Sequence, residues 1–518
     1  MPLQIEPFLT HPGGESFFLK PRADQALAAQ SLPVDTLGNR IHVEWDPQAA
    51  VTPLGQLVFF AQFLSVGGLY ADWIRQCPLK YTSPNAPEVA DVLGSWVLAS
   101  LSGASRYTHI SALRGDTVNP QGLGMKKVVC EDSLRRAFQD EDPQSLALWQ
   151  TNALLATYQP ALEKPWICDL DVTVKPIYGH QEGAEIGYNP HKPGRPCHAY
   201  HTLLVRNLRL ALDVEVHPGK EHAPKHGLAN AWRVMDRLPQ KQRPWLLCGD
   251  SAYGNEDQMH ECEARQQLYL FRQRQTRGVK QLILLMERQG GWSPLPDGRE
   301  GCEGSLILMG WTCKRRIVVT RRRCQTSAPA DPLPLLLSGD GAAELVGEPQ
   351  YEYQVLVTNL KESLSAVVDL YRQRADVENA YDELKNQWGW GGFMTKDLLR
   401  CQVAARMVAL IYNWWSLFVR CAEPKRAREA ITSRPLLLFA VGRITKSAGQ
   451  TTLILTSNHA EASHVQNLLT QLSLFLSGLK NTAEQLDAPA CWRRIWQRIL
   501  QPFYQPVAAL PCFSGGAG

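Results

Sequence analysis

The sequence predicts an α+β fold in which a strand-rich centre lies between helical regions. Residues 52–159 have the apolar spacing of amphipathic helices, and residues 166–254 contain apolar runs typical of β-strands. From about residue 361 to Val419 the pattern is helical again. Strands that are followed by a helix and then by a further strand are typical of a layered α+β core.

Helical patterns account for most of the N-terminal region. They cover residues 52–74, 87–103 and 130–159, whereas the first forty or so residues show no regular period. A DNA-binding helix-turn-helix would fit this region, and so would a helical bundle without DNA contact. Both interpretations stay open at this point.

The centre of the chain contains the strand candidates. WICDLDVTV is followed by CHAYHTLLVRN and LRLALDVEV, which suggest an antiparallel meander, and WLLCGDSAYG is typical of a buried strand that ends at an acidic residue. LILLMER, SLILMGWTC and RRIVVTRRR are the strand candidates of a β-rich insertion over residues 279–350. QYEYQVLVTNL predicts one more strand, and the last hundred residues are expected to be mostly helical, with a flexible GGAG tail.

Composition excludes several classes of protein. The net charge is only +4, from 54 basic and 50 acidic residues, so a nucleic-acid surface requires local clustering of charge. The 13 cysteines lack the spacing of a disulfide framework, and the N-terminus has no secretory signal pattern. No apolar run approaches the roughly 18 residues of a membrane span. We therefore expect a cytoplasmic protein with free thiols and no membrane partner.

Four residues in LYRQRADVENAYDELK form the first candidate site. Tyr371, Arg374, Glu378 and Lys385 fall within roughly 60° of one helical face at about 100° per residue. Glu378 could bind a metal ion there while the cations grip phosphate oxygens. Taken by itself, this helix is explained better by a solvated charged stripe with an Arg374–Glu378 pair.

Two aspartates elsewhere in the chain favour a metal-binding site over a solvated charged stripe. Asp171 lies in the strand-like ICDLDVTV, and Asp250 ends the apolar run WLLCGD. A strand aspartate in apolar surroundings is costly unless it is paired or binds a cation. With Glu378 they make an Asp, Asp, Glu set on strand, strand and helix, which can hold two Mg²⁺ ions. Asp169 shares the strand face of Asp171 and is an alternative member or a supporting hydrogen-bond acceptor.

These residues resemble a known family, the cut-and-paste insertion-sequence transposases with a DDE triad and a Tyr-Arg-Glu-Lys signature. The signature Y-x2-R-x3-E-x6-K is met by Tyr371, Arg374, Glu378 and Lys385, and the first-aspartate motif D-x-T by Asp171 and Thr173. The segments YGHQEGAEIGYNPHKPG and GDSAYGN are similar to the family's sequence too. Within the insertion-sequence-4-like superfamily, the chain looks closest to the insertion sequence 1380 branch.

The resemblance implies an RNase-H-like catalytic core interrupted by the β-rich insertion. Asp171, Asp250 and Glu378 would be the catalytic, metal-binding residues, with two Mg²⁺ ions for which Mn²⁺ can substitute. The expected organisation is as follows: a helical N-terminal domain that is the candidate DNA-binding domain over 1–160, the core over 161–278 and 351–420, the insertion over 279–350, and a helical C-terminal region over 421–518.

The same resemblance implies excision and integration of an insertion sequence. The partners would be transposon-end DNA and target DNA, held by a homodimer in a synaptic complex, with a hairpin intermediate on the transposon end. The location would be the prokaryotic cytoplasm, in association with the nucleoid. Two other functions remain open: a catalytically inactive, transposase-derived DNA-binding protein, and an RNase-H-like nuclease without strand transfer.

Basic and aromatic residues outside the triad are the candidate DNA contacts. Tyr371, Arg374 and Lys385 would position the backbone near the cut. Two clusters, FRQRQTRGVK and KRRIVVTRRR, supply phosphate contacts in this hypothesis, although charge runs are usually solvated faces. The further DNA-binding candidates are Lys192, Arg195, Arg321, Arg322 and Arg323.

Two further signals in the same regions are weaker. Trp292 and Trp311 could stack a flipped base, as the family does in its insertion, but a packing role is expected for each. PHKPGRPCHAYH suggests zinc through its histidines and Cys197, yet no paired C-x2-C elements accompany it.

Overall fold

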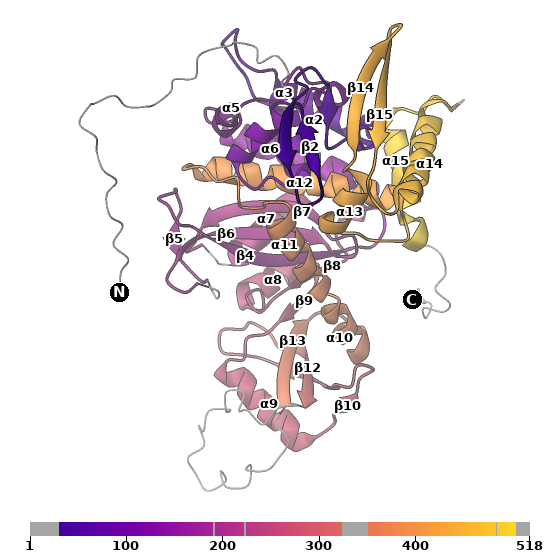
Figure 1. The fold of residues 1–518 in the computed structure, drawn as a ribbon. Helices are drawn as coiled ribbons and strands as arrows, with labels where there is room; N and C mark the ends of the chain where they lie inside the picture. The colour runs from indigo at the N-terminus through magenta and orange to yellow at the C-terminus, as the bar shows by residue number, and fades with distance from the viewer. Residues whose placement is uncertain (1–30, 190–191, 222–223, 324–350, 483, 504–518) are drawn as a thin grey trace, which may run out of the picture. The chain divides into compact units, whose positions relative to one another are not determined.

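The computed structural model describes residues 31–189, 192–221, 224–323, 351–482 and 484–503 (Figure 1). The chain divides into two compact units, residues 1–49 and 50–518. In the first unit, β1 (Leu32–Asp35) and β2 (Arg40–Val43) form an antiparallel hairpin. The predicted GGAG tail lies outside the described residues.

The predicted N-terminal helices are confirmed. The helices of this part of the second unit are α1 (Leu57–Gly67), α2 (Leu69–Arg75), α3 (Val89–Leu101), η1 (Tyr107–Leu113), α4 (Asn119–Gly122), α5 (Glu131–Arg136) and α6 (Pro143–Tyr158). Helix α6 begins where the side chain of Asp142 accepts the N–H of Ser145 at 2.8 Å. In the described part of the chain no single helix could span a membrane; α1 and α2 together pass by length and composition only, with a bend of 73°.

A ten-stranded mixed sheet forms the centre of the second unit. Its order is β10-β11-β12-β13-β9-β8-β4-β6, with β5 and β7 both paired to β6. β4 is parallel to β8, and β8 to β9; the other pairs are antiparallel. The strands are β4 (Ile167–Pro176), β5 (Glu185–Ile186), β6 (Pro196–Val205), β7 (Leu210–Pro218), β8 (Leu246–Gly249), β9 (Leu268–Arg272), β10 (Ser293–Pro294), β11 (Glu300–Leu306), β12 (Arg315–Arg323) and β13 (Tyr351–Thr358).

The parallel connections run through helices α7 (Pro224–Met235) and α8 (Glu256–Ala264). The β4, β6–β7 and β8 segments predicted as strands are thus confirmed, as are RRIVVTRRR and QYEYQVLVTNL.

Two strand predictions in the region between β9 and β12 are wrong. LILLMER belongs to helix α9 (Arg277–Gln289), whose buried residues Val279, Ile283 and Met286 follow the helical spacing of four and three. In SLILMGWTC only the first residues belong to a strand, because β11 ends at Leu306. Met309 is then fully exposed and Gly310 has a φ of 90°, so this segment is a turn and not a strand.

Helix α12 (Leu398–Ala422) covers the free edge of the sheet. It lies between β7 and the N-terminal helices (Figure 1). The side-chain amide of Asn413 accepts the N–H of Ala211 at 2.9 Å and donates to its carbonyl at 2.8 Å, which satisfies an edge residue of β7. The buried Arg406 donates to Asp213, also on β7, at 2.8 and 3.0 Å.

The C-terminal region is helical as predicted, except for one hairpin. Its helices are α13 (Ala430–Leu437), α14 (Ala462–Lys480), α15 (Ala488–Leu500) and η4 (Gln501–Phe503), whereas α10 (Leu364–Arg372) and α11 (Ala375–Gln387) come before α12. The hairpin pairs β14 (Val441–Ser447) with β15 (Gln450–Thr456) around Ala448 and Gly449, both with positive φ. β14 also pairs with β3 (Val51–Thr52), so the hairpin joins the two ends of the second unit.

Candidate active site

Parallel pairing of β4 with β8 brings two of the predicted carboxylates together. Leu170 lies opposite Gly249, so Asp171 and Asp250 are the next residues of two adjacent strands. Asp250 follows the last residue of β8, and its Oδ1 accepts the N–H of Ala252 at 2.9 Å. This turn keeps the carboxylate at the end of the strand, beside Asp171.

Asp171 has a cationic partner on the neighbouring helical segment. Nη2 of Arg374 lies 3.0 Å from its Oδ2 and donates to the carbonyl of Leu170 at 3.3 Å. Burial raises the pKa of Asp171 to about 6, although Arg374 opposes the shift, and the negative charge of Asp250 adds to it. Asp171 and Asp250 therefore lie close enough in the sheet to interact electrostatically.

The four signature residues do not share one helix, which corrects the prediction. Tyr371 lies in the last turn of α10, and Arg374 is the N-cap residue of α11. Gln373 and Arg374 keep right-handed helical angles, and the N–H of Arg374 bonds to the carbonyl of Tyr371 at 3.0 Å. The break between α10 and α11 is therefore a single tightened turn, and side chains on the two helices still point in nearly the directions expected for one continuous helix.

Tyr371 is buried beside the acidic pair. Burial raises its pKa to about 12, while Arg374 and Arg272 lower it and Asp250 raises it. Arg272 is an exposed residue at the end of β9, next to β8 in the sheet. The sequence placed Arg272 only in a basic run, and its position beside the candidate site depends on strand order.

Glu378 lies on α11, the helix that faces Asp171. Tyr381, one turn further along α11, hydrogen-bonds Thr202, whose hydroxyl donates to the carbonyl of Asp171 at 3.0 Å. Glu378 shares the helical face of Arg374 and Tyr381, and its side chain is exposed. The three carboxylates do not form a group whose oxygens all lie within 4.8 Å of one another.

Lys385 completes this face of α11. Desolvation lowers its pKa, and the negative charge of Asp171 opposes the shift. Arg374, Tyr381 and Lys385 therefore all lie within electrostatic reach of Asp171. Glu378 lies between them on the same stripe.

The donor set fits a hard divalent cation. Asp171, Asp250 and Glu378 offer carboxylate oxygens alone, which Mg²⁺ prefers to nitrogen or sulfur. The raised pKa of Asp171, caused first by burial and also by Asp250, shows that added positive charge would be stabilising there. Nε of Arg374 is buried without a hydrogen-bond partner in the described structure, so the guanidinium is held through Nη2 and not through Nε.

Asp169 has a different partner from Asp171. Its carboxylate forms a two-point ion pair with Arg206, with Nε donating to Oδ2 at 2.7 Å, and both side chains are fully buried. Arg206 also donates to the carbonyl of Leu370, the residue before Tyr371. Asp169 therefore ties β4 to α10 through Arg206, which is not one of the predicted metal ligands.

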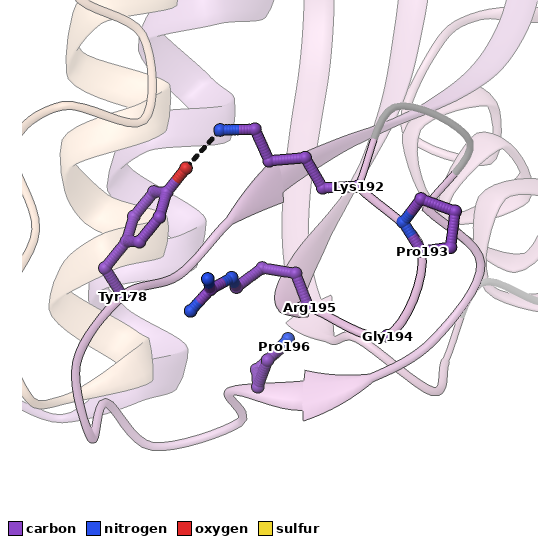
Figure 2. A pocket seen from close by; sticks show the side chains of 6 residues that line it. All are labelled: Tyr178, Lys192, Pro193, Gly194, Arg195 and Pro196. Carbon is purple, nitrogen blue, oxygen red and sulfur yellow. Dashed lines mark hydrogen bonds between the residues drawn. The ribbon is translucent and has the colours of Figure 1, made fainter.

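Lys192 and Arg195 surround an exposed tyrosine. They line a pocket of about 420 Å³ with Tyr178, as Figure 2 shows. Lys192 donates to the hydroxyl of Tyr178, and Arg195 lies 4.8 Å from the centre of its ring. The hydrogen bond from Lys192 lowers the pKa of this phenol. An exposed ring with two cations is suited to a phosphate and a base.

The basic strand β12 is mostly occupied by internal ion pairs. Arg321 contacts Glu287 at 2.5 Å and Glu300 at 2.8 Å, and it stacks over Trp292 at 4.2 Å. This disagrees with its prediction as a DNA contact. Arg322 and Arg323 are exposed at the end of the strand, so they keep that prediction.

The two tryptophans take the packing role expected for them, and the described residues of the histidine segment do not form a zinc site. Trp292 and Trp311 are half-buried and pack against the core, Trp311 under Arg315 at 5.2 Å. His191 lies outside the described residues. Cys197 and His198 do not belong to a metal-binding group in the described structure, and Nε2 of His198 bonds to the carbonyl of Glu182 at 2.8 Å.

The fold and site define a mixed α/β protein in which Asp171, within β4, lies beside Asp250, which follows the end of the adjacent parallel strand β8. Residues 78–476 match the family model described as transposase DDE domain group 1. The match covers well over half of the chain, and the chain therefore belongs to this transposase DDE domain family.

Comparison with individual proteins adds less. No curated protein matches the chain. A cryo-EM structure of a piggyBac transposase synaptic complex with hairpin DNA is similar at 10% sequence identity and a TM-score of 0.36, over 91% of this chain and 89% of that chain.

Proposed function

We propose that this protein excises and integrates an insertion sequence by metal-dependent phosphodiester hydrolysis and strand transfer. The observation that carries the proposal is the parallel register of β4 and β8, which sets Asp171 beside Asp250 below the cationic face of α11. Membership of a transposase DDE domain family supports the same reading of these carboxylates.

Asp171, Asp250 and Glu378 would hold two Mg²⁺ ions, or Mn²⁺ in their place. When bound, such ions activate an attacking oxygen and stabilise the leaving oxygen of a phosphodiester. Glu378 would reach the aspartates by a change of rotamer or a small movement of α11. Arg374 would then exchange its contact with Asp171 for the DNA backbone, because its guanidinium binds phosphate oxygens as readily as carboxylates.

The remaining signature residues would position the nucleic acid. Tyr371 and Lys385 flank the acidic pair and would contact phosphates on either side of the cut. The pocket of Tyr178, Lys192 and Arg195 offers a second contact, where a base could stack on the exposed ring.

The strand order supports an RNase-H-like core. We propose that β7, β6, β4, β8 and β9 are its five strands, with the first carboxylate on the central strand and the second on the next. On this proposal residues 279–350 are the insertion, and β12 and β13 extend the core sheet. The functional unit would be a homodimer that binds transposon ends and target DNA.

The test uses the purified chain, Mg²⁺, and DNA that carries the ends of its own element. Asp250→Asn and Glu378→Gln should abolish cleavage and leave end binding within a few-fold of the unchanged protein. Asp376→Asn is the matched control, because Asp376 is also an exposed acid of α11 but pairs with Arg209 at 2.7 Å. We expect it to cleave normally.

Three outcomes separate the candidate functions. Cleavage and joining of pre-cut ends to a target would support the transposase. Cleavage without joining would indicate a nuclease, and end binding without cleavage would indicate an inactive DNA-binding protein. The Arg374–Asp171 contact and the exposed Glu378 are the features that favour this last alternative.

A further inference from the structure

A second group of metal-ligating side chains lies at the end of β7 and the start of α7. Nδ1 of His217 is 3.4 Å from Oε2 of Glu221, and Nε2 of His226 is 3.3 Å from the same oxygen. All three side chains are half-buried, and their ligand atoms lie within 4.8 Å of one another. In the described part of the chain this is the one group of at least three such residues.

The distances suit a tetrahedral ion. With metal–ligand bonds of about 2.0–2.1 Å, neighbouring ligand atoms of a tetrahedron lie roughly 3.3–3.4 Å apart. The two histidine-to-glutamate distances, 3.4 and 3.3 Å, match this separation. Two imidazoles and one carboxylate are also a ligand set that zinc uses when a water molecule takes the fourth position.

The surroundings resemble those of a metal-bound histidine. The other ring nitrogen of His217, Nε2, lies 3.2 Å from Oε2 of Glu215, which would fix the tautomer that leaves Nδ1 free to bind a metal. Glu215 is itself held by Arg233 and lies 3.6 Å from Arg406. On the far side, Nε2 of buried His201 bonds to the backbone carbonyl of Glu221 at 2.8 Å.

This group lies across the sheet from the helix that carries Glu378. Successive strand residues point to opposite faces, and on β6 Thr202 bonds to Tyr381 of α11, whereas the ring of His201 lies 5.8 Å from that of His226 on α7. The two sites are therefore separate. They are connected through β6, where His201 bonds to the carbonyl of Glu221 and Thr202 to that of Asp171, and through α7, whose Gly227 lies directly against Tyr253.

We propose that His217, Glu221 and His226 bind a transition-metal ion of the zinc class, with a solvent molecule as fourth ligand. The ion joins the end of β7 to the first turn of α7 and so holds that helix on the sheet. The proposal does not depend on the proposed function. Mg²⁺ is a poor occupant, because it prefers oxygen ligands in octahedral geometry.

The experiment measures metal binding by the full-length protein. The chelator-treated protein is kept in excess Mg²⁺ to satisfy the carboxylate site, and Co²⁺ is added as a spectroscopic probe. We expect one equivalent to bind with visible absorption typical of tetrahedral nitrogen and oxygen ligands, and Zn²⁺ to displace it. A sulfur charge-transfer band would instead assign the binding to cysteines and overturn the proposal.

Variants assign the site. Glu221→Gln and His226→Ala should weaken Co²⁺ binding by about 100-fold or more, since even outer partners of metal ligands change affinity by roughly 10–100-fold. His260→Ala is the matched control, because His260 is an exposed histidine of α8 outside the group. It should bind as the unchanged protein does.

Stability gives a second readout that needs no activity. Zn²⁺ should raise the melting temperature of the unchanged protein and of His260→Ala, and should not raise that of Glu221→Gln, which keeps the size of the side chain. If the unchanged protein binds no Co²⁺, or if all variants bind equally, the group is only a hydrogen-bonded ionic network and the proposal is refuted.

Discussion

Replacing Asp169 by asparagine should damage the fold far more than a typical surface change. The substitution leaves Arg206 with no carboxylate partner, although its side chain is only 1% exposed and that of Asp169 is 0% exposed. Breaking a buried ion pair by removal of one partner costs about 3–5 kcal/mol, because the remaining charge stays buried. Asparagine can still accept one hydrogen bond, so we expect about 3 kcal/mol, the lower end of that range.

The assay is urea unfolding followed by tryptophan fluorescence, with Asp376→Asn as the control. That residue pairs with Arg209 in solvent, with side chains 56% and 29% exposed, so its loss should cost less than about 1 kcal/mol. The double variant Asp169→Leu, Arg206→Met should regain most of the lost stability, because it removes both charges. An Asp169→Asn midpoint equal to that of the control would refute this account of the buried pair.

The remaining predictions concern the site and its surroundings. Because the pKa of Asp171 is raised to about 6, ionisation of this carboxyl destabilises the metal-free folded protein. The free energy of unfolding should therefore fall as the pH rises from about 4 to 7, and Mg²⁺ should reverse the loss. Cleavage at sub-saturating Mg²⁺ should drop below about pH 6 and recover with more Mg²⁺; a pH profile independent of Mg²⁺ would contradict this. Neutralising Arg322 and Arg323 should reduce the slope of log affinity against log salt by close to one unit per contact, at unchanged melting temperature. Arg321→Ala should instead lower the melting temperature and leave the salt slope unchanged. A reduced slope at unchanged melting temperature would show that Arg321 contacts DNA.

The convergence of Asp171 and Asp250 could be anticipated from the sequence. Asp250 follows an apolar run of strand length and Asp171 lies within another strand-like segment, so parallel pairing of the two strands can set the two carboxylates side by side. The position of Glu378 could be anticipated only in part. The spacing predicts the helical face on which Glu378 lies. The break at Gln373 and Arg374 cannot be predicted, because no Gly or Pro marks it in the sequence.

Misassigned segments have a common physical cause, which is that a short apolar run has the same composition in a strand and in a buried helix. The run LILLMER predicts a strand for that reason, whereas its burial in the fold is helical. The hairpin of β14 and β15 was missed for a different reason. Most of its residues are exposed on both faces, so no apolar alternation marks the two strands.

Charge was the least predictable property of all, because a sequence shows where cations are but not what they contact. The basic run around β12 suggests one DNA-binding surface, yet its ladder with β11 and β13 brings Glu300 opposite Arg321 and Glu352 opposite Arg322. Alternation along the strand then separates the roles: Arg321 turns to Glu287 and Glu300, and Arg322 turns to solvent. The histidine group shows the converse, since His217, Glu221 and His226 form no recognisable motif until the chain folds back from β7 into α7. Ion pairs and metal sites of this kind depend on tertiary contacts, so their residues have to be sought in the folded chain.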